Sequence, residues 1–132
     1  MDLRIDMELR DTLLLVTAVG ELRFDPALRL LKQICDTAKE NQVNKIVVNA
    51  LAIYGTISTV ERYSLGAQVA TYIQQALPNL RLAIVGKPPT IDGFGVKVAQ
   101  NRGMVAEVFS TQQDALNWLD VWRKSGPLVR RQ

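Results

Sequence analysis

The alternation of two hydrophobic patterns along the chain is the feature that most limits its possible folds. Short, nearly continuous apolar segments at 13–19, 46–48, 80–85 and 104–109 are separated by stretches in which apolar residues recur with helical spacing. A strand that is apolar on both faces needs cover on both faces, and helices provide it when parallel strands are joined by right-handed crossovers. The pattern predicts an α/β fold with a mostly parallel sheet.

The N-terminal segment follows a different period. Between Leu3 and Leu9 apolar and charged residues alternate strictly, which is typical of a half-buried edge strand. Arg10 and Asp11 are suited to a turn into the first apolar segment, so residues 3–19 are predicted to form a β-hairpin. The full order of elements is then ββαβαβαβα, with five strands in one sheet.

Local signals indicate where the two long helices begin. Asp25 is expected to cap the first helix, with Pro26 at its first position, where the missing N–H costs nothing. Ser58 precedes Glu61 by three residues, which is the capping-box pattern and predicts the start of a second long helix.

Two shorter helices are expected in the second half of the chain. The first is predicted at 94–102 and is closed by Gly103, because glycine is the commonest residue just after a helix end. The second is predicted at 112–123, with Ser110 or Thr111 as its cap.

The length of 132 residues indicates one domain. Residues 1–123 are expected to form a single α/β domain, followed by a basic flexible tail at 124–132. The net charge of +3 comes from that end, because residues 1–122 hold 12 basic and 13 acidic residues, a net charge of −1. The basic residues are scattered, so nucleic-acid binding is not expected.

The chain offers few groups for chemistry. It contains no histidine, the commonest general base and metal ligand. Cys35 lies on the apolar stripe of the first helix and is interpreted as a core residue. No catalytic residue, metal site or cofactor is expected. An enzyme of unknown type, for example one that pairs Asp92 with Lys87, stays as an alternative.

The location of the protein is also predicted from what the sequence contains. No uncharged apolar run approaches the roughly 18 residues that a transmembrane helix needs. The first six residues alternate charge with hydrophobicity, unlike a signal peptide, and the single cysteine excludes an internal disulfide. We therefore expect a cytoplasmic protein without a transmembrane segment.

Three hydroxyl residues lie near the start of the second helix: Thr56, Ser58 and Thr59. The simplest interpretation is a helix cap. The alternative is a phosphorylation site, because the free amides and the dipole of a helix N-terminus stabilise a phosphate.

A loop at 86–95 follows the carboxyl end of a buried strand, where α/β sheets usually hold ligands. It is interpreted either as an ordinary surface loop or as part of a binding site. The residues considered as contacts for a ligand or an anion are Tyr54, Lys87, Ile91, Phe94 and Arg102.

The second helix carries no charged residue from Tyr63 to Asn79. Besides the stripe that faces the sheet, it has a second apolar stripe made of Leu65, Val69, Tyr72 and Ala76. A helix that is apolar on two sides needs cover on two sides. That cover is either another helix of the same domain, a bound apolar ligand, or an interface with a second subunit or partner.

The order of elements, together with several short motifs, resembles the SpoIIAA-like (STAS) superfamily, in particular its bacterial STAS/SEC14-like branch. The motifs are Gly20-Glu21-Leu22, Lys45 to Ala50, Arg81 to Val85, Asn101-Arg102-Gly103, Val108-Phe109 and Ala115 to Leu119. The anti-sigma-factor antagonists of this group carry an Asp-Ser-Ser-Gly turn with a phosphorylated serine after the third strand. The present chain has hydroxyl residues near that position, but it lacks the aspartate and the glycine of the Asp-Ser-Ser-Gly turn.

The resemblance implies a SpoIIAA-like fold and a non-catalytic role. We expect a regulatory or protein-interaction domain that works through helix 58–77 and adjoining loops, as a homodimer or with a protein partner. The alternative is a carrier of a small apolar or anionic, lipid-like ligand held between loops 51–57 and 86–95. The carrier requires a cavity of several hundred Å³, lined by Ile53, Tyr54, Ile91 and Phe94.

Overall fold

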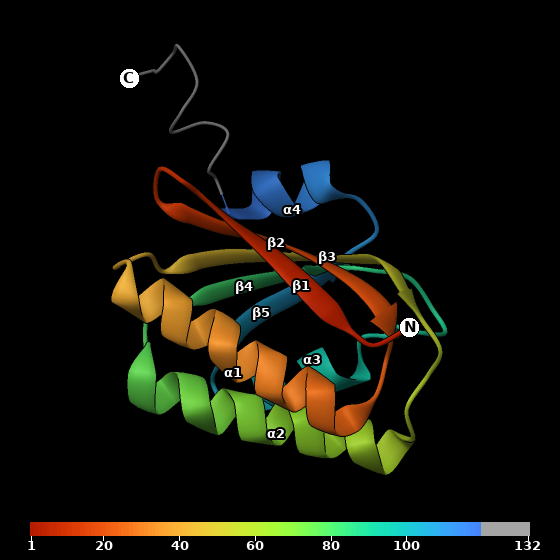
Figure 1. The fold of residues 1–132 in the computed structure, drawn as a ribbon. Helices are drawn as coiled ribbons and strands as arrows, with labels where there is room; N and C mark the ends of the chain where they lie inside the picture. Colours follow the sequence, from red (N-terminus) through yellow and green to blue (C-terminus); the bar gives the residue numbers. More distant parts are fainter. Residues whose placement is uncertain (120–132) are drawn as a thin grey trace.

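The computed structural model describes residues 1–119, and its elements alternate as the sequence predicts (Figure 1). The strands are β1 (Arg4–Arg10), β2 (Leu13–Glu21), β3 (Lys45–Tyr54), β4 (Arg81–Val85) and β5 (Val105–Phe109). The helices are α1 (Phe24–Glu40), α2 (Thr59–Ala76), α3 (Phe94–Asn101) and α4 (Gln112–Leu119).

The strands form one sheet in the order β1-β2-β3-β4-β5. β1 and β2 are antiparallel, joined by a turn in which Asp11 has a φ of 52°. All later neighbours are parallel, because each pair is connected through a helix. The predicted α/β class, the hairpin and the place of β1 at the sheet edge are confirmed, in a mixed sheet with four strands parallel to one another.

The helices cover the two faces of the sheet unequally. α1, α2 and α3 lie on one face and α4 lies on the other (Figure 1). Alternate residues of the central strands serve the two sides, as a period of two requires. Ile46 and Leu82 pack in the core under the three helices, whereas Val47 and Ala83 pack beneath α4.

The start of α1 differs from the expectation. Its cap position is Arg23, which is extended and makes no capping hydrogen bond through its side chain. The amide of Ala27 donates to the carbonyl oxygen of Arg23 (3.0 Å), so the helix already includes Phe24 and Asp25. Asp25 is therefore a first-turn acidic residue near the positive end of the helix, and its predicted role as the cap is wrong.

The start of α2 is as predicted. The Ser58 hydroxyl accepts a hydrogen bond from the Glu61 amide (3.1 Å), and the Glu61 carboxylate accepts one from the Ser58 amide (2.9 Å). This reciprocal pair is a complete capping box.

β3 is much longer than the predicted strand at 46–48. Residues 51–54, expected in a loop, continue the strand beyond the end of β4. They pair with the long second strand, since Val19 lies opposite Ala52 and Glu21 opposite Tyr54, after an irregularity between Thr17 and Val19. The expected loop 51–57 is thus reduced to residues 55–58.

The smaller helices agree closely with their signals. Gly103 follows the last turn of α3 with a φ of 91°, a left-handed conformation that glycine adopts without strain. The hydroxyl of Thr111 accepts from the amide of Asp114 (3.2 Å), so Thr111 caps α4 rather than Ser110. The predicted end of that helix at 123 and the tail at 124–132 lie outside the described residues.

Cys35 is buried on α1, as expected for a core residue. Burial, with a smaller contribution from the neighbouring Asp36 charge, raises the pKa of its thiol to about 12. A thiol with this pKa stays protonated and unreactive at neutral pH.

In the described part of the chain, no helix is both long and apolar enough to cross a membrane.

The second apolar stripe of α2 is covered within the chain. α2 packs between α1 and α3. Val69 is buried and Leu65 is half-buried against the same core. The Tyr72 hydroxyl donates to the Asp36 carboxylate of α1, and the Lys32 ammonium lies 5.5 Å from the ring centroid of Tyr72.

The cover for this stripe is therefore another helix of the same domain, one of the alternatives left open by the sequence. Ala76, the last residue of the stripe, is half-buried. An interface through Leu65, Val69, Tyr72 and Ala76 stays a prediction, but Val69 contributes to the interior of its own chain. Dimerisation also stays a prediction.

Candidate functional site

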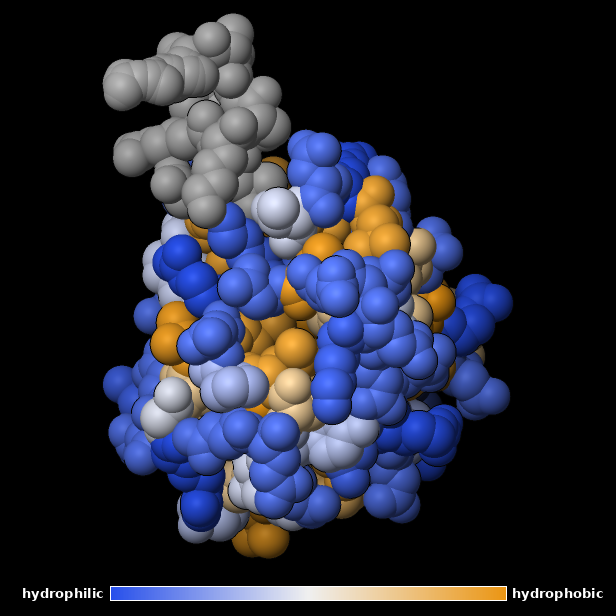
Figure 2. Space-filling view, turned by 90° about the vertical axis from the view of Figure 1, so that its left-hand side faces the viewer, coloured by the Kyte–Doolittle hydropathy of each residue, from blue (hydrophilic) through white to orange (hydrophobic). Residues whose placement is uncertain are grey.

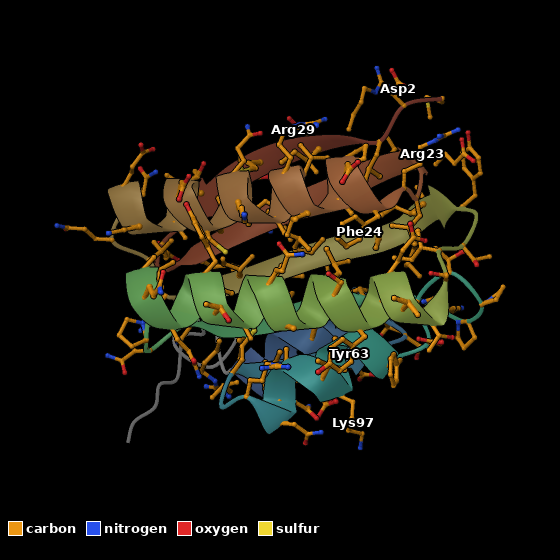
Figure 3. The ribbon with its side chains drawn as sticks, turned by 90° about the horizontal axis from the view of Figure 1, so that it is seen from below. Asp2, Arg23, Phe24, Arg29, Tyr63 and Lys97 are labelled. Atoms are coloured by element: carbon orange, nitrogen blue, oxygen red, sulfur yellow. The ribbon has the colours of Figure 1, made fainter. Side chains whose placement is uncertain are left out.

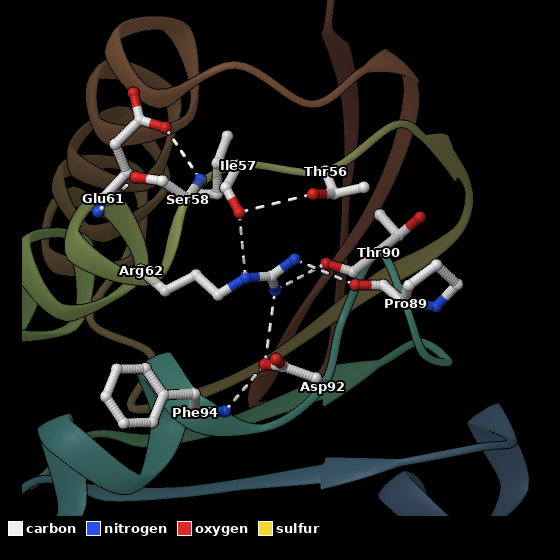
Figure 4. Close-up of polar contacts among 9 residues, drawn as sticks. All are labelled: Thr56, Ile57, Ser58, Glu61, Arg62, Pro89, Thr90, Asp92 and Phe94. Carbon is white, nitrogen blue, oxygen red and sulfur yellow. Dashed lines mark hydrogen bonds and ion pairs between the residues drawn. The ribbon is translucent and has the colours of Figure 1, made fainter.

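The candidate site lies at the edge of the sheet where β3 and β4 end (Figure 4). Two loops meet there: residues 55–58 lead from β3 into α2, and residues 86–93 lead from β4 into α3. The peptide bond between Pro88 and Pro89 is cis. The carboxyl ends of parallel strands are the usual position for functional sites in α/β proteins, because the loops there converge.

Arg62, in the first turns of α2, joins the two loops. Its side chain is only 11% exposed. The guanidinium donates to the carbonyl oxygens of Ile57 (3.2 Å), Pro89 (2.9 Å) and Thr90 (2.9 Å), and to the carboxylate of Asp92 (3.3 Å) (Figure 4). The planar fork of an arginine suits several acceptors at once, which the single ammonium of a lysine does not.

Asp92 extends the network to the next helix. Its carboxylate also accepts from the amide of Phe94, the first residue of α3. Gly93, between them, has a φ of 86°. Residues 89–94 are therefore fixed to α2 by one side chain. Arg62 was not among the site residues predicted from the sequence. It is the last charged residue before the uncharged stretch of that helix, and this position is the sequence feature that could have identified it.

The three hydroxyl residues of the site have different surroundings. Ser58 is engaged in the capping box, so its interpretation as a cap is confirmed. The hydroxyl of Thr56 donates to the carbonyl of Ile57 (3.4 Å). Thr59 is an exposed residue at the start of α2. Phosphorylation of any of them stays a prediction. A phosphate on Ser58 would lie beside the Glu61 carboxylate and would compete with it for the helix start.

The residues predicted to contact a ligand do not converge. The Tyr54 hydroxyl accepts from the N-terminal amino group of Met1 (2.9 Å). Arg102 lies at the end of α3, where its guanidinium donates to the Tyr63 hydroxyl (2.9 Å) and lies over that ring. Lys87 is exposed on the loop after β4. Of the five, Lys87 and Ile91 belong to the 86–93 loop of the candidate site, and Phe94 directly follows it.

Of the alternative acid/base pair, Asp92 forms its ion pair with Arg62 (3.3 Å), and none of the ion pairs among residues 1–119 involves Lys87. Among residues 1–119, no group of three or more His, Cys, Asp or Glu residues is arranged to hold a metal ion.

Large apolar side chains are exposed around this edge. Val60 and Tyr63, in the first two turns of α2, are 77% and 49% exposed, and Phe94 at the start of α3 is 38% exposed. Tyr63 lies where α2 and α3 run side by side (Figure 3). Neighbouring exposed apolar residues beside a fixed loop are typical of an interaction surface.

A cavity of about 100 Å³ lies beneath the loop, between α2, α3 and the sheet. Ile57, Leu65, Ile84 and Ile91 are among the residues that line it. The carrier hypothesis predicted a cavity of several hundred Å³ between loops 51–57 and 86–95. This cavity is smaller, although residues of both loops line it, namely Ile57 and residues 90–93 and 95. Of its four expected lining residues only Ile91 is present, because Ile53, Tyr54 and Phe94 lie outside the lining.

The opposite edge, at the amino ends of the parallel strands, carries a separate hollow. Figure 2 shows this face, where apolar atoms are visible between polar side chains. The hollow has a volume of about 340 Å³ and is lined by Thr12 and by residues 42–44 and 76–80. Its lining contains no charged residue, since it is formed by Thr12, Gln42, Val43, Asn44, Ala76, Leu77, Pro78, Asn79 and Leu80.

Comparisons with known proteins place this geometry in a fold family. No protein-family model and no curated protein sequence matches the chain. An anti-sigma factor antagonist from Mycobacterium paratuberculosis is similar in structure, with a TM-score of 0.62 at 15% sequence identity over 89% of this chain and 93% of that one. The unphosphorylated form of the anti-sigma factor antagonist SpoIIAA gives a TM-score of 0.55 at 18% identity, over 88% and 97% of the two chains.

The chain has a SpoIIAA-like fold. An uncharacterised protein of the same fold from Shewanella loihica is also similar, with a TM-score of 0.52 at 20% identity over 89% of this chain and 93% of that one. The resemblance stated from the sequence is confirmed at the level of fold. In this SpoIIAA-like chain, the candidate site lies at the start of α2, the helix that follows the third strand.

Proposed function

We propose that this chain is a non-catalytic regulatory domain that binds a partner protein at the carboxyl edge of its sheet. The observation that carries the proposal is the exposure of Val60, Tyr63 and Phe94 beside a loop that Arg62 holds in place. The expected contact therefore combines apolar anchors with a fixed backbone.

Physical reasoning supports this surface. Aromatic and aliphatic anchors that become fully desolvated contribute most of the affinity in protein interfaces. A backbone that is already ordered loses little conformational entropy on binding. Because Arg62 uses its donors on the loop, it acts as a positioning residue and leaves the contact itself to the exposed side chains.

The similar structures suggest the class of partner. Two of them are described as anti-sigma factor antagonists, proteins that act on another regulatory protein. We propose a protein partner for this chain by analogy, and a second copy of the chain is the alternative. Phosphorylation at Thr56, Ser58 or Thr59 would add negative charge at the same edge and is proposed as a means of control.

The partner surface is tested by affinity capture from the native host with a matched pair of variants. Val60→Glu places a charge on the proposed surface, and Val105→Glu places the same charge on an exposed position of β5, 49% exposed. A protein retained by the wild type and by Val105→Glu, but reduced at least about tenfold with Val60→Glu, supports the proposal. Equal capture by all three proteins contradicts it.

The alternative of a homodimer has its own measurement. Light scattering over a range of concentrations reports whether the 14.7 kDa chain self-associates. A dimer that dissociates with Val60→Glu identifies the second copy as the occupant of this surface. A chain that stays monomeric at the highest concentration would exclude the homodimer and leave a different protein as the proposed partner.

A further inference from the structure

We propose that the cavity beneath the 86–93 loop binds a small, uncharged apolar ligand. This inference goes beyond the proposed function and does not depend on it. It rests on the chemistry of the cavity wall, on its connection to solvent, and on the way its entrance is held.

The wall of the cavity is almost entirely aliphatic. α2, α3, β4 and β5 all contribute to it, together with the loop and with Leu31 of α1. The polar side chains of the lining belong to Arg62, Thr90 and Asp92. Arg62 and Asp92 are already paired with each other and with the loop backbone. A charged ligand would lose its hydration without gaining a free partner, whereas a hydrocarbon loses nothing.

The cavity reaches solvent. Ile84 lies in β4, which is flanked by β3 and β5 and covered by helices on both faces. A residue in this position is expected to be fully buried, as its neighbour Leu82 is, yet Ile84 is only half-buried. Leu65 and Val96, which also line the cavity, are half-buried as well. Apolar wall atoms are therefore accessible to a small molecule.

Small residues keep the space open. A Cβ atom on Gly66 would collide with the backbone of Gly95, so α2 and α3 are in close contact at that point. Ala99 and Ala106, on α3 and β5, line the cavity with only a methyl group each. The volume of about 100 Å³ is somewhat below the roughly 150 Å³ of dry apolar cavities known to bind benzene or xenon.

We expect the entrance to lie beside the loop that Arg62 holds, because this loop forms one side of the cavity. Thr90, Ile91, Asp92 and Gly93 form part of the cavity wall. Two of the Arg62 hydrogen bonds end on the backbone at the start of this segment, at Pro89 and Thr90. Movement of residues 89–93 away from α2 would widen the entrance, so we expect a ligand to enter and leave at this loop.

The experiment adds benzene or phenol to the full-length chain. Binding is measured by the change in unfolding temperature and by the changes in backbone amide NMR shifts. Benzene is expected to raise the unfolding temperature by a few degrees at concentrations well above its Kd. Its shift changes should concentrate on residues 62–69, 82–84 and 90–99. Phenol has to bury a hydroxyl against a mainly aliphatic wall in which Arg62 and Asp92 are already paired, and it is expected to bind at least about tenfold more weakly.

Variants distinguish the cavity from the surface. Ala106→Val fills the cavity from β5 and is expected to abolish the benzene response, whereas Ala52→Val, an exposed position of β3, keeps it. Ala99→Val fills the same space from α3 and serves if Ala106→Val does not fold. Equal effects of benzene and phenol, or a benzene response that survives both filling variants, would overturn the proposal. Val60→Glu should leave the benzene response intact, so failure of the partner surface and failure of the cavity are separable.

Discussion

The two faces of the sheet are packed differently, although they share the same strands. Under α4, Leu13, Val47, Ala83 and Val85 are all buried in one cluster with Ala115 and Leu119. Arg81 closes that side, since its guanidinium lies 4.8 Å from the Trp118 ring and donates to the Trp118 carbonyl (2.9 Å). Under α1, α2 and α3, a cavity remains and Ile84 keeps partial contact with solvent.

The difference shows how helix number affects packing on a twisted sheet. One helix can adjust its position until its apolar side chains fill the space beneath it. Three helices also have to fit against each other, and the contact between Gly66 and Gly95 fixes α2 against α3. The cavity of about 100 Å³ leaves part of the apolar wall on this face without contacts to other side chains. On the same face, Arg62 supplies polar contacts between α2 and the two loops.

The largest effect is expected from Arg62→Ala. The variant removes the donors that hold three carbonyl oxygens and Asp92, and it should lower the free energy of unfolding by about 3 kcal/mol. Hydrogen exchange of residues 89–94 should increase strongly. Urea unfolding and exchange mass spectrometry measure the two effects.

Arg23→Ala is the matched control for that prediction. Arg23 forms an ion pair with Glu21 (3.4 Å) in which its side chain is 70% exposed, so its loss should cost less than about 0.5 kcal/mol. Equal destabilisation by the two arginine variants would mean that the loop is not held by Arg62.

A pair of alanine-to-valine variants tests the packing difference directly. Ala83 faces the tight cluster under α4 and Ala106 faces the cavity, on neighbouring strands. Ala83→Val should destabilise the protein by about 1–3 kcal/mol through overpacking. Ala106→Val should be neutral or stabilising within about 1 kcal/mol, because its methyl groups fill empty space. The reverse ranking in urea unfolding would show that the faces are not packed as described.

The pH dependence of stability tests whether Cys35, on the three-helix face of the sheet, is shielded from water. Burial raises the pKa of Cys35 from 9.0 to about 12. The stability that this shift represents is fully present below about pH 9 and is lost as the pH rises toward 12, because the unfolded thiol ionises first. The wild type should lose about 1.4 kcal/mol by pH 10 relative to Cys35→Ala.

Comparing the two proteins at pH 8, 9 and 10 cancels the groups that titrate in both. The pKa of the Tyr72 hydroxyl is raised mainly by its hydrogen bond to Asp36, which both proteins keep, and least by the charge of Cys35, which only the wild type has. Identical pH profiles for the wild type and Cys35→Ala would indicate that water reaches the thiol.

The smallest effect is expected at the helix cap beside Arg62. Ser58→Ala removes one half of the capping box and should cost about 1 kcal/mol. Ser58→Asp keeps a cap acceptor but places a second carboxylate near Glu61, so it should recover only part of that loss. A Ser58→Ala variant as stable as the wild type in thermal unfolding would mean that Arg62 alone fixes the start of α2.

Several parts of this molecule could be predicted because their signals are local. The capping box at Ser58 and the glycine after α3 depend on neighbours within a few residues. The long extension of β3 could not be predicted from its own residues, because it depends on pairing with β2. The same applies to Arg62, whose acceptors at Pro89, Thr90 and Asp92 are about thirty residues away in the sequence.

The candidate site shows the same division. The loop at 86–95 and the hydroxyl residues near Ser58 were identified from the sequence as the region of interest. The sequence did not show which side chains meet in this region. Tyr54 and Arg102 were predicted to contact a ligand, but they form hydrogen bonds with Met1 and Tyr63. The second apolar stripe of α2 was recognised from its spacing, but only the fold revealed that α1 covers it.

The sequence by itself determined the α/β class, the hairpin, the order of the elements and most helix ends, because hydrophobic period and capping chemistry act within one or two turns of chain. The tertiary structure decided what covers α2, how far β3 extends, where a cavity remains and which loop Arg62 holds. Each of these depends on groups that are distant in the sequence and come together only when the helices pack on the sheet.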